Sequence, residues 1–78
     1  MLDYDFLDTT QDRSEFELIT IKMLCEQLDG VIHLIKYGQP ISTDMKDWKK
    51  LKKALKVVLR NYLTLHEFEA MIKEIKNA

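Results

Sequence analysis

The segment around residues 12–40 carries more apolar side chains than one face of a helix can hold. At 3.6 residues per turn, one broad face takes Leu18, Ile21, Leu24, Cys25, Leu28, Val31, Ile32 and Ile35. The adjoining face takes Phe16, Ile19, Met23, Leu34 and Tyr37. A clearly polar strip is left only at Lys22, Glu26, Asp29 and His33. A helix that is apolar almost all round must be covered almost all round.

This first predicted helix has sequence signals at both ends. It begins near the sequence DRSEFE, where Ser14 and Glu17 have the spacing of a capping box. It continues to the sequence LIKYGQP, where Gly38 followed by Pro40 predicts a stop.

Gly30 lies inside the helix and costs about 1 kcal/mol relative to alanine. It would allow a kink, or a break with residues 31–37 (VIHLIKY) as a strand. We expect a continuous helix because the same apolar stripe runs on both sides of Gly30.

A second helix is expected after the sequence ISTD, in which Ser42, Thr43 and Asp44 can all act as N-caps. Its apolar residues alternate at spacings of three and four, which predicts one buried stripe. That stripe is Trp48, Leu51, Leu55, Val58 and Tyr62.

A third helix is expected from Thr64, which forms a capping box with Glu67, while Leu63 can pack on Phe68. Its predicted stripe is Leu65, Phe68, Ile72 and Ile75. The link to the second helix is so short that the two must form a hairpin or a nearly perpendicular corner.

The first dozen residues alternate acidic and large apolar side chains: Leu2, Asp3, Tyr4, Asp5, Phe6, Leu7 and Asp8. They could form a short strand, an arm packed on the domain, or a peptide that awaits a partner; we expect the arm. The chain is then divided into an arm (residues 1–12) and a single helical domain (residues 13–78).

The predicted fold is all-α: a small bundle in which the long first helix packs against a hairpin of the second and third. The composition of 46% hydrophobic and 32% charged residues, with two Gly and one Pro, fits such a domain. A chain of 78 residues with one cysteine has a limited core and no disulfide, so a second subunit is the expected stabiliser.

The dimer prediction follows from the first helix, because two short helices cover one of its apolar faces but not both. An uncovered apolar strip marks an interface. We expect a homodimer through Phe16, Ile19, Met23, Leu34 and Tyr37. The alternative is that the arm folds over this strip with Tyr4, Phe6 and Leu7.

A row of basic residues is predicted on the polar side of the second helix. We call it the lysine row: Lys46, Lys49, Lys50, Lys53, Lys56 and Arg60. Such a row can contact phosphates without reading sequence. Three features disfavour nucleic-acid binding by this row. It is nearly all Lys with almost no Arg, it has no interleaved aromatic residue, and the chain has a net charge of −1. Glu67, Glu69 and Glu74 on the third helix would also repel phosphate.

A solvated surface is therefore the default interpretation of the lysine row. A membrane-surface helix or a calmodulin-type target helix would need the same apolar stripe that the core requires, so both are disfavoured. The row could also pair with the acidic arm, in the same or a second subunit, or dock another protein.

The sequence indicates no catalytic, metal or cofactor site. Cys25 falls on the main apolar face, His33 on the polar strip and His66 in the first turn of the third helix, with no partner at a fixed spacing. The two glycines are isolated, so no phosphate loop exists. The carboxylates are scattered over surface positions, and the sequence implies no apolar pocket that would shift their pKa values. We predict that the chain is not an enzyme.

We expect a small cytoplasmic protein–protein interaction module (an adaptor, inhibitor or regulator) that binds itself and an unidentified protein. The alternative is a nucleic-acid-binding regulator that uses the lysine row. The start MLDYDFLDTT lacks the features of a signal peptide, and no apolar run is long enough to cross a membrane. A single free cysteine is typical of a reducing compartment.

Overall fold

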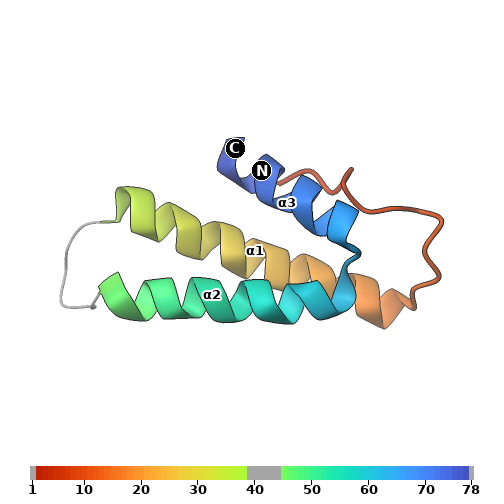
Figure 1. The fold of residues 1–78 in the computed structure, drawn as a ribbon, viewed down its shortest axis with the longest axis horizontal. Helices are drawn as coiled ribbons and strands as arrows, with labels where there is room; N and C mark the ends of the chain where they lie inside the picture. The colour runs from red at the N-terminus through yellow and green to blue at the C-terminus, as the bar shows by residue number, and fades with distance from the viewer. Residues whose placement is uncertain (1, 39–44, 78) are drawn as a thin grey trace.

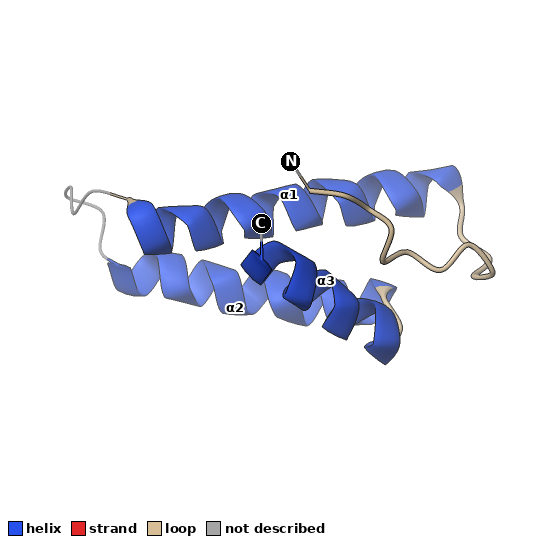
Figure 2. Ribbon diagram, turned by 90° about the horizontal axis from the view of Figure 1, so that it is seen from above, coloured by secondary structure: helices blue, strands red, loops and turns tan. Residues whose placement is uncertain are grey.

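The computed structural model describes residues 2–38 and 45–77, and these residues form three helices and no strand. The helices are α1 (Glu15–Tyr37), α2 (Met45–Tyr62) and α3 (Leu65–Asn77). α1 and α2 lie side by side and run antiparallel, and α3 lies across one side of the pair (Figures 1 and 2). The all-helical prediction is confirmed.

The pairing of the helices differs from the predicted one. α1 packs on α2 along much of its length, whereas α2 and α3 meet mainly around their shared corner. The antiparallel hairpin is therefore α1 with α2, and α3 turns back over the pair. A sharp corner after Leu63 allows this, because it leaves the apolar side of α3 facing α1.

The predicted ends of α1 are confirmed. The Ser14 side chain accepts a hydrogen bond from the Glu17 amide at 3.1 Å, and the Gly38 amide donates to the Leu34 carbonyl at 2.8 Å. A Cβ at Gly38 would lie 2.2 Å from that carbonyl oxygen, so this close approach requires glycine.

α1 also runs unbroken through Gly30, which confirms the continuous helix over the strand alternative. Pro40 and the expected caps of α2, Ser42, Thr43 and Asp44, lie outside the described residues.

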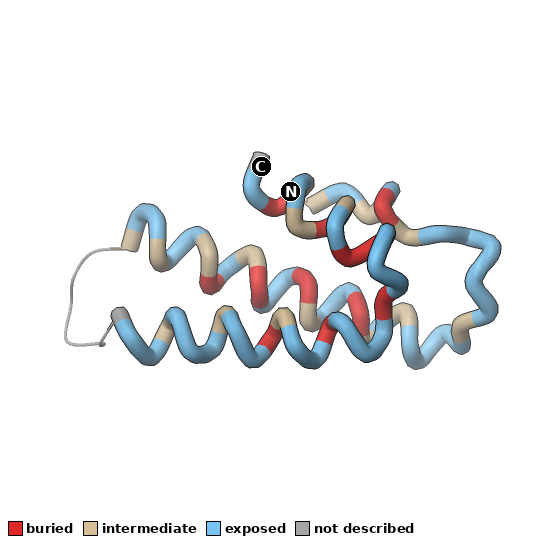
Figure 3. The backbone as a smooth tube through the Cα atoms, viewed as in Figure 1, coloured by how far each residue is buried: buried red, intermediate tan, exposed pale blue. Residues whose placement is uncertain are grey.

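The buried residues of the three helices meet in one core (Figure 3). The predicted stripe of α2 is wrong in part: Leu55 is buried, but Leu51, Val58 and Tyr62 are exposed, while Leu59 and Leu63 are buried instead. The buried line is rotated because α2 must face α1 and α3 at once.

The prediction for α3 is corrected in the same way. Leu65 is exposed, and Met71, which the predicted stripe omits, is fully buried against Cys25 of α1. Phe68 and Ile75 are buried as expected, and Ile72 is half-buried.

The N-terminal arm packs across the body, as expected. Phe6 is buried in the core, and the Tyr4 hydroxyl donates to the Lys22 carbonyl at 3.3 Å and to the Glu26 carboxylate at 3.1 Å. The arm thus contacts the polar strip of α1 at Lys22 and Glu26, and the five residues of the second apolar strip stay exposed. The alternative in which the arm hides that strip is wrong.

Candidate interaction surfaces

The second apolar strip of α1 remains at the surface of the folded chain. All five residues expected at a dimer interface are exposed: Phe16, Ile19, Met23, Leu34 and Tyr37. At 3.6 residues per turn, Phe16, Met23 and Leu34 lie opposite Cys25, which contacts α3. Ile19 and Tyr37 lie at the edge of the strip, on the side of Glu26, which binds the arm.

Three exposed apolar residues of α2 extend this strip: Leu51, Val58 and Tyr62. The flank of α2 toward α3 is marked by Lys52 and Lys56, which line a cavity together with Lys76 of α3. Since the buried Leu55 lies between that flank and the three apolar residues, these residues face away from α3. We call the eight residues of the two strips the α1/α2 face.

The α1/α2 face has the size of a protein interface. Its eight side chains are between 39% and 78% exposed. Because a large side chain has about 150–250 Å² of surface, they present on the order of 800 Å² per protomer. A stable interface of standard size buries about the same area on each partner.

Gly30 lies within the α1 part of this face. It is exposed, and a Cβ at this position would meet nothing within 4 Å. No contact with the described residues 2–38 and 45–77 therefore explains a glycine in the middle of a helix.

The lysine row is divided by the fold. Lys46, Lys49, Lys50 and Lys53 are exposed. Lys56 is half-buried and turned toward α3, and the guanidinium carbon of Arg60 lies 4.9 Å from the centre of the Phe68 ring. The row is thus only partly exposed, because Lys56 and Arg60 pack toward α3.

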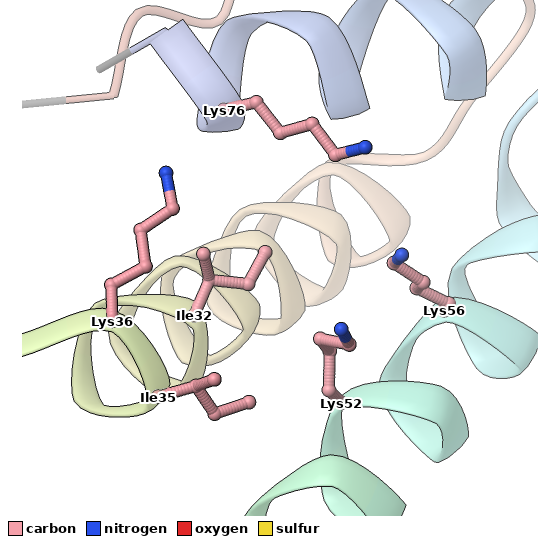
Figure 4. Close-up of a pocket in the computed structure, with 6 residues that line it drawn as sticks. All are labelled: Ile32, Ile35, Lys36, Lys52, Lys56 and Lys76. Atoms are coloured by element: carbon pink, nitrogen blue, oxygen red, sulfur yellow. The ribbon is translucent and has the colours of Figure 1, made fainter.

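A cavity of about 230 Å³ opens beside the row, where α1, α2 and α3 converge. Its lining consists of Ile32, Ile35, Lys36, Lys52, Lys56 and Lys76 (Figure 4). We call it the four-lysine pocket. The sequence did not indicate this pocket, because its lining comes from three helices whose relative placement has no local sequence signal. Only the spacing of Lys52 and Lys56 by one turn is visible in the sequence.

The like charges of the pocket lysines repel one another. Partial burial, and then the charges of Lys52, Lys76 and Arg60, lower the pKa of Lys56 below its ordinary value. Among the described residues, no aspartate or glutamate lines the pocket, so its charge is not neutralised locally.

Glu67 has a structural role that the sequence did not indicate. It was expected among the surface acids of the third helix, but it is fully buried and forms an ion pair with Arg13. Its capping box with Thr64 is confirmed by two hydrogen bonds of 3.0 and 3.2 Å. The same carboxylate thus caps α3 and holds the segment before α1.

The cysteine and the two histidines are not brought together. Cys25 is buried, and burial raises the pKa of its thiol to about 12, so the thiol stays protonated at neutral pH. The thiol lies 3.3 Å from the Met71 sulfur. His33 and His66 are both exposed, the former with its ring centre 5.0 Å from that of Tyr37.

Within residues 2–38 and 45–77, no group of three or more potential ligand residues could hold a metal ion. None of the helices in this part combines the length and hydrophobicity needed to cross a membrane. Comparison of the chain with protein-family models, with curated proteins and with solved structures found no match in any of the three.

Proposed function

We propose that this chain is a small helical interaction module that works as a homodimer through the α1/α2 face. In the dimer, α1 and α2 of one copy pack against α1 and α2 of the second copy about a twofold axis. The single observation that carries this proposal is the exposure of eight large apolar side chains on α1 and α2 of so small a chain.

The occupant is a second copy because the face fits a copy of itself in size and charge. Its area of roughly 800 Å² per protomer is what a standard stable interface buries. α1 carries four acidic and two basic residues, whereas α2 carries seven basic residues and one acidic residue. A twofold arrangement that places α1 next to the partner's α2 brings opposite charges together and sets the orientation.

Gly30 supports the same arrangement. A glycine inside a helix costs about 1 kcal/mol, and in the described part of the chain nothing lies within 4 Å of a Cβ built at Gly30. A second helix that packs closely on α1 would supply the missing reason, because the absence of a side chain lets the two backbones come together.

The dimer leaves the outer lysines free to bind an acidic partner protein, as an adaptor, inhibitor or regulator would. Lys49, Lys50 and Lys53 are exposed on the part of α2 that does not belong to the α1/α2 face. We place this activity in the cytoplasm, where a single unpaired cysteine is stable.

The test is the molar mass in solution, measured by light scattering coupled to size exclusion, for the wild type and for Met23→Glu. The wild type should be a dimer, and the substitution should convert it to monomer, since it puts a charge into the interface. Val57→Glu is the matched control: Val57 is 55% exposed, against 56% for Met23, but lies outside the α1/α2 face. A monomeric wild type, or an equal effect of both substitutions, would refute the proposal.

A nucleic-acid-binding regulator is the second candidate, favoured by one observation. Lys36 of α1 and Lys76 of α3 lie beside Lys52 and Lys56, so the basic surface is wider than α2 alone provides. Fluorescence anisotropy with a labelled duplex at 50 and 200 mM salt tests it. Four phosphate contacts should weaken binding by about a hundredfold between these concentrations. Absence of binding at the lower one removes this candidate.

A further inference from the structure

We propose that the four-lysine pocket binds a small organic anion in which a doubly charged head group is joined to an apolar body, as in a phosphate monoester. This site is independent of the proposed dimer, because it opens on the α3 side of the α1/α2 pair and the α1/α2 face lies on the other side.

The charge of the ligand follows from the rim of the pocket. One lysine from α1, two from α2 and one from α3 line the same space (Figure 4). Each ammonium group has three donors and no acceptor, and like charges that converge repel one another. A phosphate monoester offers about two negative charges and three acceptor oxygens at neutral pH, which matches several ammonium groups at once.

The apolar body follows from the floor of the pocket. Ile32 and Ile35 are half-buried on α1 and form the part of the lining that is not lysine. The stems of the four lysines add further apolar surface around them. A bare inorganic ion would satisfy the charges but leave this surface in contact with water, so an anion that carries a hydrocarbon group should bind better.

The volume sets the size of the ligand. About 230 Å³ is the share of roughly eight water molecules in the liquid, so the site suits a molecule of about ten non-hydrogen atoms. This is below the range of about 300–1,000 Å³ that is typical of larger cofactors and drug-sized ligands. Phenyl phosphate has the right size, charge and apolar part, and it is the probe for the experiment.

The first measurement is titration calorimetry with phenyl phosphate, inorganic phosphate and benzyl alcohol at constant ionic strength. We expect phenyl phosphate to bind at least about tenfold more tightly than inorganic phosphate and benzyl alcohol to show no binding, because the site needs both halves of the ligand. Equal affinities for phenyl phosphate and inorganic phosphate would show only a cationic surface and would overturn the proposal.

The second measurement compares two doubly substituted variants with the same change in charge on the same helix. Lys52→Gln with Lys56→Gln removes two lysines of the pocket, whereas Lys49→Gln with Lys53→Gln removes two exposed lysines. The first should weaken phenyl phosphate binding at least about tenfold, and the second less than about twofold. Similar losses in both variants would mean that general electrostatic attraction, and not the pocket, holds the ligand.

Two controls keep these results interpretable. Glutamine has nearly the helix propensity of lysine, so both variants should fold, which circular dichroism and thermal unfolding check. Met23→Glu should bind phenyl phosphate as the wild type does. If Met23→Glu remains a dimer and binds phenyl phosphate, only the proposed dimer is refuted. If Met23→Glu is a monomer and the wild type does not bind phenyl phosphate, only the proposed pocket ligand is refuted.

Discussion

The ion pair of Glu67 with Arg13 joins the segment before α1 to the corner between α2 and α3. Arg13 donates from Nη1 to Glu67 at 2.8 Å, and its Nη2 lies 3.3 Å from the Tyr62 carbonyl oxygen. The amides of Asp8 and Thr64 donate to the two carboxylate oxygens at 2.8 and 3.0 Å. Burial by itself would raise the pKa of Glu67, but these hydrogen bonds lower it to about 2.

Replacing this carboxylate should destabilise the fold. Glu67→Gln keeps the size of the side chain but leaves the guanidinium of Arg13 poorly exposed and without its counter-charge. Breaking a buried pair in this way costs about 3 kcal/mol or more. Urea unfolding followed by circular dichroism measures the loss. Glu69→Gln, at an exposed position of the same helix, is the control and should change the unfolding free energy by less than about 0.5 kcal/mol.

The same residue predicts how stability depends on pH. The folded pKa of Glu67 is about 2, below its ordinary value of 4.5. Its contribution is therefore fully present above about pH 4.5 and is lost as the pH falls toward 2. After allowance for solvent screening, we expect this loss to be on the order of 2 kcal/mol. Chemical unfolding between pH 6 and pH 2 measures it, and a pH profile of Glu67→Gln as steep as that of the wild type would contradict the assignment.

At the scale of elements, the arm completes the core that the helices form. Phe6 belongs to that core, and Leu2, Tyr4 and Leu7 pack against it. Lys22 places its ammonium nitrogen 5.4 Å from the centre of the Tyr4 ring. The arm therefore acts as a fourth packing element, although it forms no regular helix or strand.

Phe6→Ala tests this role of the arm. Removing a buried phenylalanine side chain leaves a cavity and costs about 3–5 kcal/mol in a well-packed core. The lower end is expected here, because the arm can move to fill part of the space. Thermal or urea unfolding provides the measurement. Asp5→Ala, at an exposed position of the arm, should be nearly neutral, and a neutral Phe6→Ala would show that the arm does not stabilise the fold.

Gly30→Ala separates the stability of the helix from that of the dimer. In a lone protomer the added methyl meets nothing, so better helix propensity should stabilise the fold by about 1 kcal/mol. In the proposed dimer the methyl enters the interface and should weaken association by tenfold or more. Urea unfolding in the monomeric Met23→Glu background measures the first effect, and sedimentation at several protein concentrations without that substitution measures the second. Unchanged association would argue against close packing of helices at Gly30.

For the whole molecule, the decisive feature is that other parts of the chain cover only some of the apolar surface of the α1/α2 pair. α3 and the arm pack against the pair, whereas the eight large apolar side chains of the α1/α2 face stay exposed. The result is an elongated body of 43 × 21 × 19 Å. A chain of 78 residues has few elements to spare, so burial of the second side requires another molecule.

Dimerisation should make thermal stability depend on protein concentration. Anything that binds the folded state stabilises it by mass action. Between about 1 and 100 µM protein, the gain for a dimer corresponds to an increase in Tm of more than about 5 °C for a domain of this size. Scanning calorimetry or circular dichroism over this range measures it. The Tm of Met23→Glu should stay constant, and a constant Tm for the wild type would contradict a folded dimer.

How far the sequence predicts the surfaces depends on how local their causes are. The exposed strip of Phe16, Met23 and Leu34 could be predicted from the periodicity of one helix. That helix has apolar residues on more of its surface than two neighbouring helices can cover. The contribution of Leu51 and Val58 could not be predicted, because it depends on how far α2 is rotated about its own axis. The four-lysine pocket depends on three helices and was missed for the same reason.

What the sequence by itself determined is the set of local features. The caps at Ser14 and Thr64 and the continuous α1 follow from backbone hydrogen bonding and side-chain periodicity within a few residues. Only the tertiary structure decided which side of α2 is buried and that Glu67 lies inside as the partner of Arg13. Such features depend on how helices far apart in sequence pack together in the core. Close packing of their side chains, and not local helix propensity, decides which residues are buried.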